Sequence, residues 1–222
     1  MSHFQRGTLL ETYRFGSGKF EVKVFLSISI GKSKSQKCFP YSNIYQNMKF
    51  QERIHQDLYE YLRMEQIVDA MLPTCPDVEE KWTEIREEYL PDGVREFTNY
   101  PTASLGWMMY IGMAVAKFWD ENWTDYNDID NLYESIRNER GYDHLDEYVL
   151  EEVLSLEKED LKKTEIIVGE CAARTLSNLQ REKIQSGTPE AFNAYIECLH
   201  ELYLMGCYIQ LNAMGYHLVK SE

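Results

Sequence analysis

The stretch from Gly106 to Trp123 reads GWMMYIGMAVAKFWDENW: its first half carries almost no polar side chain, and its second half is aromatic and acidic. A helix that crosses a lipid bilayer needs about 20 consecutive apolar residues. The mostly apolar run here extends from Ala103 to Phe118, 16 residues, and Lys117 interrupts it. We therefore expect a helix in the core of a folded protein, and no membrane partner.

On a helix of 3.6 residues per turn, this stretch has two unlike faces. The broad face is bulky and is expected to fill the core; it consists of Trp107, Met108, Ile111, Val115, Phe118 and Trp119. The narrower face could pack against a helix, line a cleft or meet a partner. The predicted ligand or partner surface is this narrower face with the end of the helix and one residue of the last helix: Gly106, Tyr110, Met113, Lys117, Trp119, Trp123 and Tyr203.

The chain from Ser42 onward predicts an all-α fold, a bundle of six or seven helices. Pro73 and Pro76 end the first helix, Asp77 caps the second in a capping box with Glu80, and Pro91 ends it. The expected helices are 44–72, 77–90, 103–118, 129–140, 143–156, 158–185 and 189–214. In the sixth, the residues available for burial are Ile166, Ile167, Ala173 and Leu176. In the short turn Ser186-Gly187-Thr188-Pro189, Thr188 can cap the last helix and Pro189 fits its first turn. So short a turn makes the last two helices antiparallel neighbours.

Residues 1–41 differ from the rest in charge and in pattern. Residues 1–49 carry eight Lys or Arg against two Glu, whereas the whole chain has a net charge of −14. Phe20 to Ile30 alternates apolar and polar residues like a strand, and Leu9 to Phe15 can pair with it as a hairpin. We expect a basic β-hairpin appendage (1–41) on an acidic helical domain (42–222). Translation from Met48 would omit this appendage, and both alternatives stay open.

Charge and cysteine usage limit the partners and the compartment. The acidic surface repels phosphate backbones, so we expect no nucleic-acid partner. The five cysteines are odd in number and have no paired spacing, which favours free thiols. No secretion signal precedes the first strand pattern, and we therefore expect a cytoplasmic protein.

The sharpest chemical signal is a pair of Glu-x-x-His motifs, Glu52/His55 and Glu197/His200. They resemble the motifs with which ferritin-like proteins bind two metal ions inside a helical bundle. On helical wheels, however, Glu52 and Glu197 both lie away from the apolar face of their helix. Glu170 is the best further ligand candidate, but it is expected ~7 Å along the axis from His200. We predict no cofactor and keep a di-metal site as the alternative.

Glu170 also has a simpler interpretation. It lies in the apolar run Ile166 to Ala173, where an unpaired carboxylate is costly, and Arg174 follows four residues later. Residues four apart on a helix are neighbours, so we expect a structural Glu170–Arg174 ion pair.

Two classes of function remain at the level of sequence. There is no G-x-S-x-G elbow, and no pattern ties a Cys or Ser to a His and an acid. The 16 tyrosines and four tryptophans favour interfaces. We expect a non-catalytic protein-interaction or self-association module, with a protein partner or a homo-oligomer. The alternative is a small-molecule or metal-binding bundle with a pocket near Tyr110, Met113, Trp123 and Tyr203.

Overall fold

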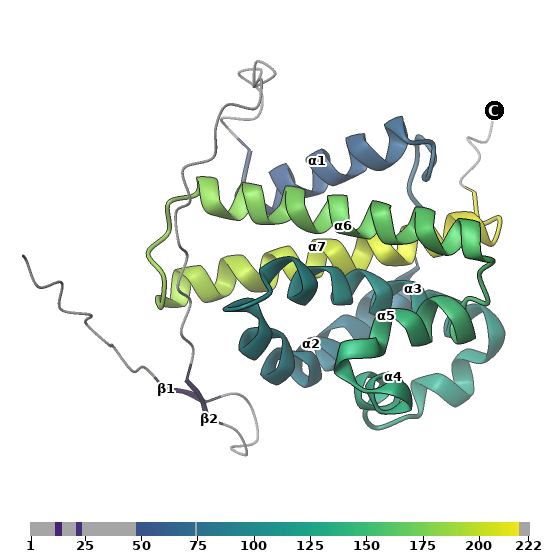
Figure 1. The fold of residues 1–222 in the computed structure, drawn as a ribbon, viewed down its shortest axis with the longest axis horizontal. Coiled ribbons are helices and arrows are strands. Elements are labelled where there is room, and N and C mark those ends of the chain that lie inside the picture. Colours follow the sequence, from purple (N-terminus) through teal and green to yellow (C-terminus); the bar gives the residue numbers. More distant parts are fainter. Residues whose placement is uncertain (1–11, 15–20, 24–47, 74, 218–222) are drawn as a thin grey trace, which may run out of the picture.

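The computed structural model describes residues 12–14, 21–23, 48–73 and 75–217. From residue 48 onward the described chain is all-α, which confirms the predicted fold class (Figure 1). Its elements are α1 (Phe50–Met64), α2 (Pro76–Phe97), α3 (Pro101–Asn127), α4 (Leu132–Arg140), η3 (Tyr142–His144), α5 (Leu145–Glu147), η4 (Tyr148–Val153), α6 (Lys158–Arg181) and α7 (Pro189–Ala213). None of these helices is long and apolar enough to cross a bilayer.

Two short strands are described before the helices. β1 (Thr12–Arg14) and β2 (Glu21–Lys23) pair antiparallel, with Tyr13 opposite Val22. Residues 1–11, 15–20 and 24–47 lie outside the described part of the chain. The hairpin appendage of residues 1–41 therefore stays a prediction.

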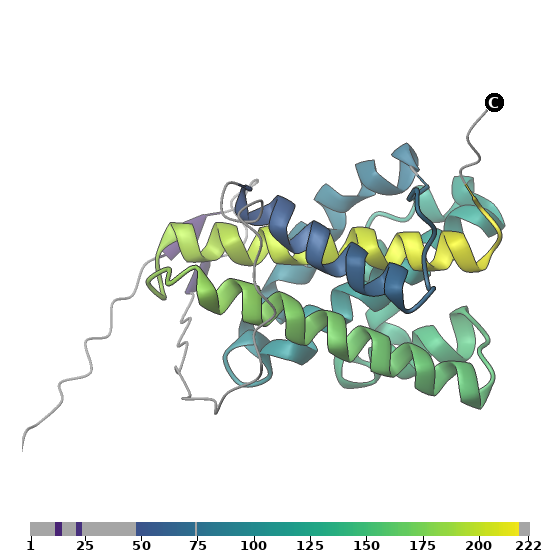
Figure 2. The ribbon, with the colours of Figure 1, turned by 90° about the horizontal axis from the view of Figure 1, so that it is seen from above.

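The helix α3 lies at the centre of the bundle. It packs most extensively on α7 and also contacts α2 and α6. Figure 2 shows α6 and α7 side by side and running in opposite directions, as predicted, with α1 lying across them. From Ser104 to Ala116 nearly every side chain of α3 is buried. Helices that are apolar all round are typical of such a buried position.

Two glycines allow α3 and α7 to touch through their backbones. A Cβ on Gly112 would lie well inside van der Waals contact of the Tyr203 carbonyl oxygen and 3.1 Å from the Cys207 nitrogen. A Cβ on Gly206 would overlap the Met109 carbonyl oxygen in the same way. No larger residue fits at either position without separating the two helices.

Several predicted helix ends are wrong. The first helix ends at Met64 rather than Leu72, because Gln66 takes a left-handed conformation (φ 59°) and Ile67 donates its N–H to the Leu62 carbonyl. The second helix begins at Pro76, with Cys75 rather than Asp77 as the cap. It also continues through Pro91, which lies on the solvent side, where the missing N–H and the displaced carbonyl cost least.

The later helices also depart from the prediction in part. The helix α3 continues to Asn127 and is interrupted at Asn122, and residues 142–153 form 3₁₀, α and π turns instead of one α-helix. The helix α6 exposes Ile166, whereas we expected it to be available for burial. The start of α7 is as predicted: the Thr188 hydroxyl accepts the Ala191 N–H (3.2 Å) and Pro189 occupies the first turn.

The glycine contact between α3 and α7 is testable by adding one methyl group. Gly112→Ala and Gly206→Ala should each lower the free energy of unfolding by about 3 kcal/mol or more, because the new Cβ would overlap a backbone carbonyl. The matched control is Gly169→Ala in α6, where a Cβ meets nothing within 4 Å. It should raise stability by about 0.5–1 kcal/mol. Urea denaturation measures all three, and equal effects would contradict the backbone contact.

Candidate functional site

The narrower face of α3 mostly meets other helices. Gly106, Tyr110 and Met113 are buried, and Gly106 lies against side chains of α6. Burial raises the pKa of Tyr110 far above its usual value. Lys117 is half-buried, and its Nζ lies 3.2 Å from a carboxylate oxygen of Glu121. Of these four predicted residues, only Lys117 is open to a ligand or partner.

The other three residues of the predicted surface are held within the bundle. The Trp119 indole N–H donates to the Asp77 carboxylate at 3.1 Å. Tyr203 is fully buried, and its hydroxyl donates to the Val78 carbonyl at 2.7 Å. Trp123 is half-buried against the core. Trp119 and Tyr203 therefore fasten α3 and α7 to the start of α2.

Two of the predicted metal-ligand candidates lie on outer faces with local partners. Glu52 is exposed and accepts the backbone N–H of Lys49 at 3.0 Å, so it caps α1. Glu170 is also exposed and pairs with Arg174 at 3.1 Å. This contact confirms the predicted Glu170–Arg174 ion pair.

The histidines of the two motifs, His55 and His200, lie near the carboxylate of Glu201, which belongs to neither motif. This α7 residue is only 3% exposed. Its Oε2 lies 2.9 Å from His55 Nδ1, and its Oε1 accepts from Gln51 Nε2 at 2.8 Å. The same Gln51 nitrogen lies 3.2 Å from His200 Nδ1. A part-buried polar cluster thus joins α1 to α7.

The surroundings of this cluster favour a structural role. The His200 ring packs on Trp82 (centroids 4.8 Å apart), and burial lowers the pKa of His200. Burial, and then the charge of Glu201, raises the pKa of Glu197. In the described part of the chain, no three His, Cys, Asp or Glu side chains converge to hold a metal ion. The di-metal alternative therefore gains no support from this geometry.

The sequence around Glu201 does indicate that this residue is buried, although the helical wheel of the last helix did not reveal it. The residues around it, from Cys198 to Cys207, are apolar on every side of the helix, apart from His200. A helix of that kind is buried all round, so a carboxylate within it must find a partner inside the protein.

The Glu201 cluster predicts a large stability difference between two glutamates of one helix. Glu201→Ala should lower the free energy of unfolding by about 3–5 kcal/mol, because it leaves His55 and Gln51 without their buried acceptor. Glu197→Ala, one turn away and half-buried, should cost less than about 1 kcal/mol. Urea denaturation of the two variants checks this. Equal losses would show that the cluster does not fasten α1.

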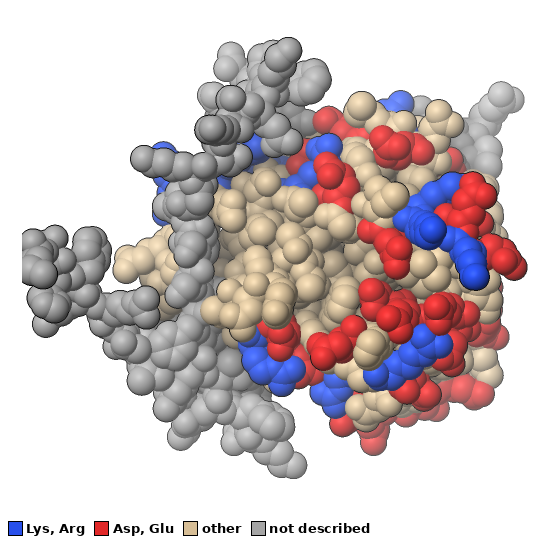
Figure 3. All heavy atoms as spheres, in the orientation of Figure 1, with Lys and Arg blue, Asp and Glu red and all other residues tan. Residues whose placement is uncertain are grey.

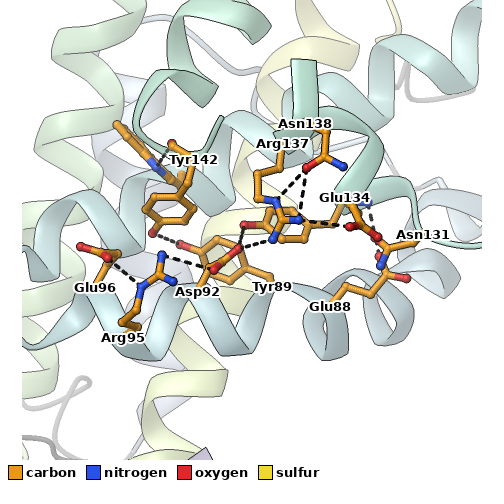
Figure 4. A network of polar contacts seen from close by, with 12 residues as sticks. Glu88, Tyr89, Asp92, Arg95, Glu96, Asn131, Glu134, Arg137, Asn138 and Tyr142 are labelled. Atoms are coloured by element: carbon orange, nitrogen blue, oxygen red, sulfur yellow. Dashed lines mark hydrogen bonds and ion pairs between the residues drawn. The ribbon is translucent and has the colours of Figure 1, made fainter. Parts of the chain in front are cut away.

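A second polar network joins α2 to α4 around Asp92 (Figure 4). Asp92 is buried, and its Oδ2 accepts from the Tyr133 hydroxyl at 2.9 Å and from Arg137 at 2.8 Å. Its other oxygen lies 3.3 Å from Arg95. Burial, and then Coulomb repulsion from Asp92 and the hydrogen bond to it, raises the pKa of Tyr133. The network holds α4 against α2 with its charges paired.

Glu88 lies at the edge of the same network. It accepts the Tyr133 backbone N–H at 3.3 Å, in the first turn of α4. Burial, with repulsion from Glu84 and Glu134, raises its pKa from 4.5 to about 7, although the Tyr133 N–H and Lys81 act in the opposite direction. Glu88 therefore keeps its proton in the folded protein at a pH where the unfolded chain has lost it.

The raised pKa of Glu88 predicts a pH-dependent gain from Glu88→Gln. Between pH 4.5 and about 7 the folded state binds more protons than the unfolded state, so Glu88 makes stability fall as pH rises through this window. Glu88→Gln should raise Tm at pH 8 and leave it nearly unchanged at pH 4.5. The control is Glu87→Gln, on an exposed neighbour. A gain that does not depend on pH would contradict the assignment.

A pocket of about 420 Å³ opens where α3, α4 and η4 meet. Lys117 lines it, together with Phe118 and Tyr126, whose rings stack with centroids 4.1 Å apart. Glu139 of α4 and Tyr148 of η4 also line it. The sequence offered no spacing that would unite these residues, because they come from three segments that only the tertiary fold brings together.

In the comparisons with known proteins, no protein family, curated protein or solved structure matches this chain.

Proposed function

We propose that the chain is a non-catalytic interaction module that associates with a second copy of itself through an uncharged face of α3 and α6. The supporting observation is a stripe on the solvent side of α6 with alternating spacings of three and four residues: Ile166, Gly169, Ala173, Leu176 and Gln180. All five are exposed or half-buried, and Ile166 is 69% exposed. This spacing is typical of a seam that packs on another helix.

The beginning of α3 extends the same face. Gly106 packs against Val168 and Ala172, and α3 and α6 run in opposite directions, so the residues before Gly106 lie beside those after Ala172. No charged residue occurs between Glu96 and Lys117. Tyr100, at the start of α3, is 65% exposed. Tyr100 and the α6 stripe together are called the uncharged face below.

The charge of the molecule favours a second copy as the occupant. In Figure 3, drawn in the orientation of Figure 1, charged side chains crowd the half where α4 and α5 lie, and the other half has a broad uncharged area. Two bodies with a net charge of −14 each repel one another least where neither carries charge. Homodimer interfaces are also more apolar than the rest of the surface. The same charge disfavours a nucleic-acid partner.

The buried ionisable groups support a non-catalytic role, because they are paired in helix-to-helix contacts. Glu201 joins α1 to α7, and Asp92 joins α2 to α4. Lys81 of α2 donates to the Asn127 carbonyl at the end of α3 (3.0 Å) and pairs with Glu84 at 2.8 Å. Each of these groups has a packing role that accounts for its burial.

The cytoplasm remains the proposed location. Cys75, Cys171, Cys198 and Cys207 are free and buried in the structure, which suits a reducing compartment. This proposal is separate from that of self-association.

Self-association predicts a charge-sensitive dimer. Light scattering after size exclusion should show a dimer that dissociates on dilution. Ile166→Glu should weaken it at least about tenfold, because each copy then places a carboxylate in the seam. The exposure of Ile166 means that the substitution should leave the fold intact, which circular dichroism can verify.

The matched control is Met64→Glu at the end of α1, an apolar residue that is 80% exposed and lies off the uncharged face. It adds the same charge and should leave the dimer unchanged. A wild-type protein that stays monomeric at high concentration contradicts the proposal. Equal weakening by both variants would place any association elsewhere.

A further inference from the structure

The pocket beside Lys117 lies where three segments depart from regular α-helix. The helix α3 is interrupted at Asn122, residues 148–153 of η4 form a π-helical turn, and Ser155 takes a left-handed conformation with φ 52°. π-turns and left-handed non-glycine residues cost free energy and occur often at binding sites. The volume of about 420 Å³ lies within the range of pockets that hold small molecules.

One wall of the pocket is aromatic. Phe118 and Tyr126 stack almost in parallel, with an interplanar angle of 10°. Tyr148 comes from η4, and burial followed by the charges of Glu139 and Glu152 raises its pKa. Tyr126 and Tyr148 are half-buried and line the pocket, so each keeps part of its ring accessible, and an aromatic ring attracts a positive charge.

The polar lining has more negative than positive charge. It contains the carboxylates of Glu121, Glu139 and Glu152, and Lys117 is its cation. Lys117 pairs with Glu121 at 3.2 Å, and Glu152 accepts from Arg140 at 2.8 Å. Glu139 makes no ion pair with any residue that the structure describes. One carboxylate is therefore left for a cation from outside.

We propose that this pocket binds a small organic cation of the alkylammonium class, with its charged nitrogen between Glu139 and the rings of Tyr126 and Tyr148. An ammonium group gains from both kinds of neighbour, since carboxylates accept its hydrogen bonds and aromatic faces attract its charge. The alkyl part of the ligand lies against Val153 and Leu154, which are half-buried and also line the pocket. This site does not depend on the self-association proposed above.

The arrangement of the carboxylates distinguishes this ligand from a metal ion. Calcium takes six to eight oxygen ligands at about 2.3–2.6 Å and needs them to converge on one point. No such convergence of three His, Cys, Asp or Glu side chains occurs among the described residues. Carboxylates spread over different walls suit an extended cation instead.

The test is a titration of the full chain with three probes of one length: putrescine, its neutral analogue butanediol and the dianion succinate. Calorimetry gives the affinity, and NMR shows which backbone amides shift. We expect putrescine alone to bind, with shifts confined to the end of α3, α4 and η4. Added salt should weaken the binding only in part, because the rings contribute as well.

Glu139→Gln removes the unpaired carboxylate and should lower the putrescine affinity about tenfold. The matched control is Glu165→Gln, which removes the same charge from an exposed position on α6. It should leave the affinity unchanged. Tyr126→Leu, which removes a ring and keeps an apolar side chain, should also weaken binding.

Four outcomes would overturn the proposal. If butanediol or succinate bound as tightly as putrescine, the pocket would not be selective for a cation. Equal losses from Glu139→Gln and Glu165→Gln would show general attraction to the acidic surface. Shifts located elsewhere, or no binding of putrescine at all, would remove the cation site. None of these results bears on the dimer, whose own test uses Ile166.

Discussion

The close contact of α3 and α7 determines where the other helices of the bundle pack. Gly112 and Gly206 let the two backbones meet without side chains between them. Because the helices are this close, both are surrounded by the remaining ones: α2 and α6 pack on α3, and α1 packs on α7. Close packing of this kind leaves little freedom for adjustment, since protein interiors are as dense as organic crystals. Any polar group on the facing sides must therefore find its partner within the protein.

The peripheral helices are held by those partners as well as by apolar contact. The buried carboxylate of Glu201 binds α1 through His55 and Gln51, and Asp92 binds α4 through Tyr133 and Arg137. The residues left for recognition lie outside this framework. They are the uncharged stripe on α6 and the pocket at the far end of α3, where the helix is interrupted at Asn122.

The sequence pattern was sufficient for the fold class and for some local features, such as the cap at Thr188 and the Glu170–Arg174 pair. The sequence pattern was misleading for the rule that a proline ends a helix. Pro91 does not end α2, because it lies on the solvent side of that helix. The wheel of α3 left open whether its narrower face packs against a helix, lines a cleft or meets a partner, because a wheel cannot show that α6 covers Gly106. The α6 stripe was available in the sequence at heptad spacing, although we expected Ile166 to be available for burial. The pocket was not available, because its walls come from segments that are distant in sequence.

If the α3–α7 contact holds the bundle together, it is the most stable part of the molecule, and native-state hydrogen exchange can measure this. The amides of Met109 to Gly112 and of Tyr203 to Cys207 should exchange only through global unfolding, with a free energy equal to that measured by urea denaturation. The amides of α1 should exchange through smaller local openings, because that helix buries one face only. If α1 were as protected as the two central helices, or if the amides around Gly112 and Gly206 exchanged by local opening, the contact would not be what holds the bundle together.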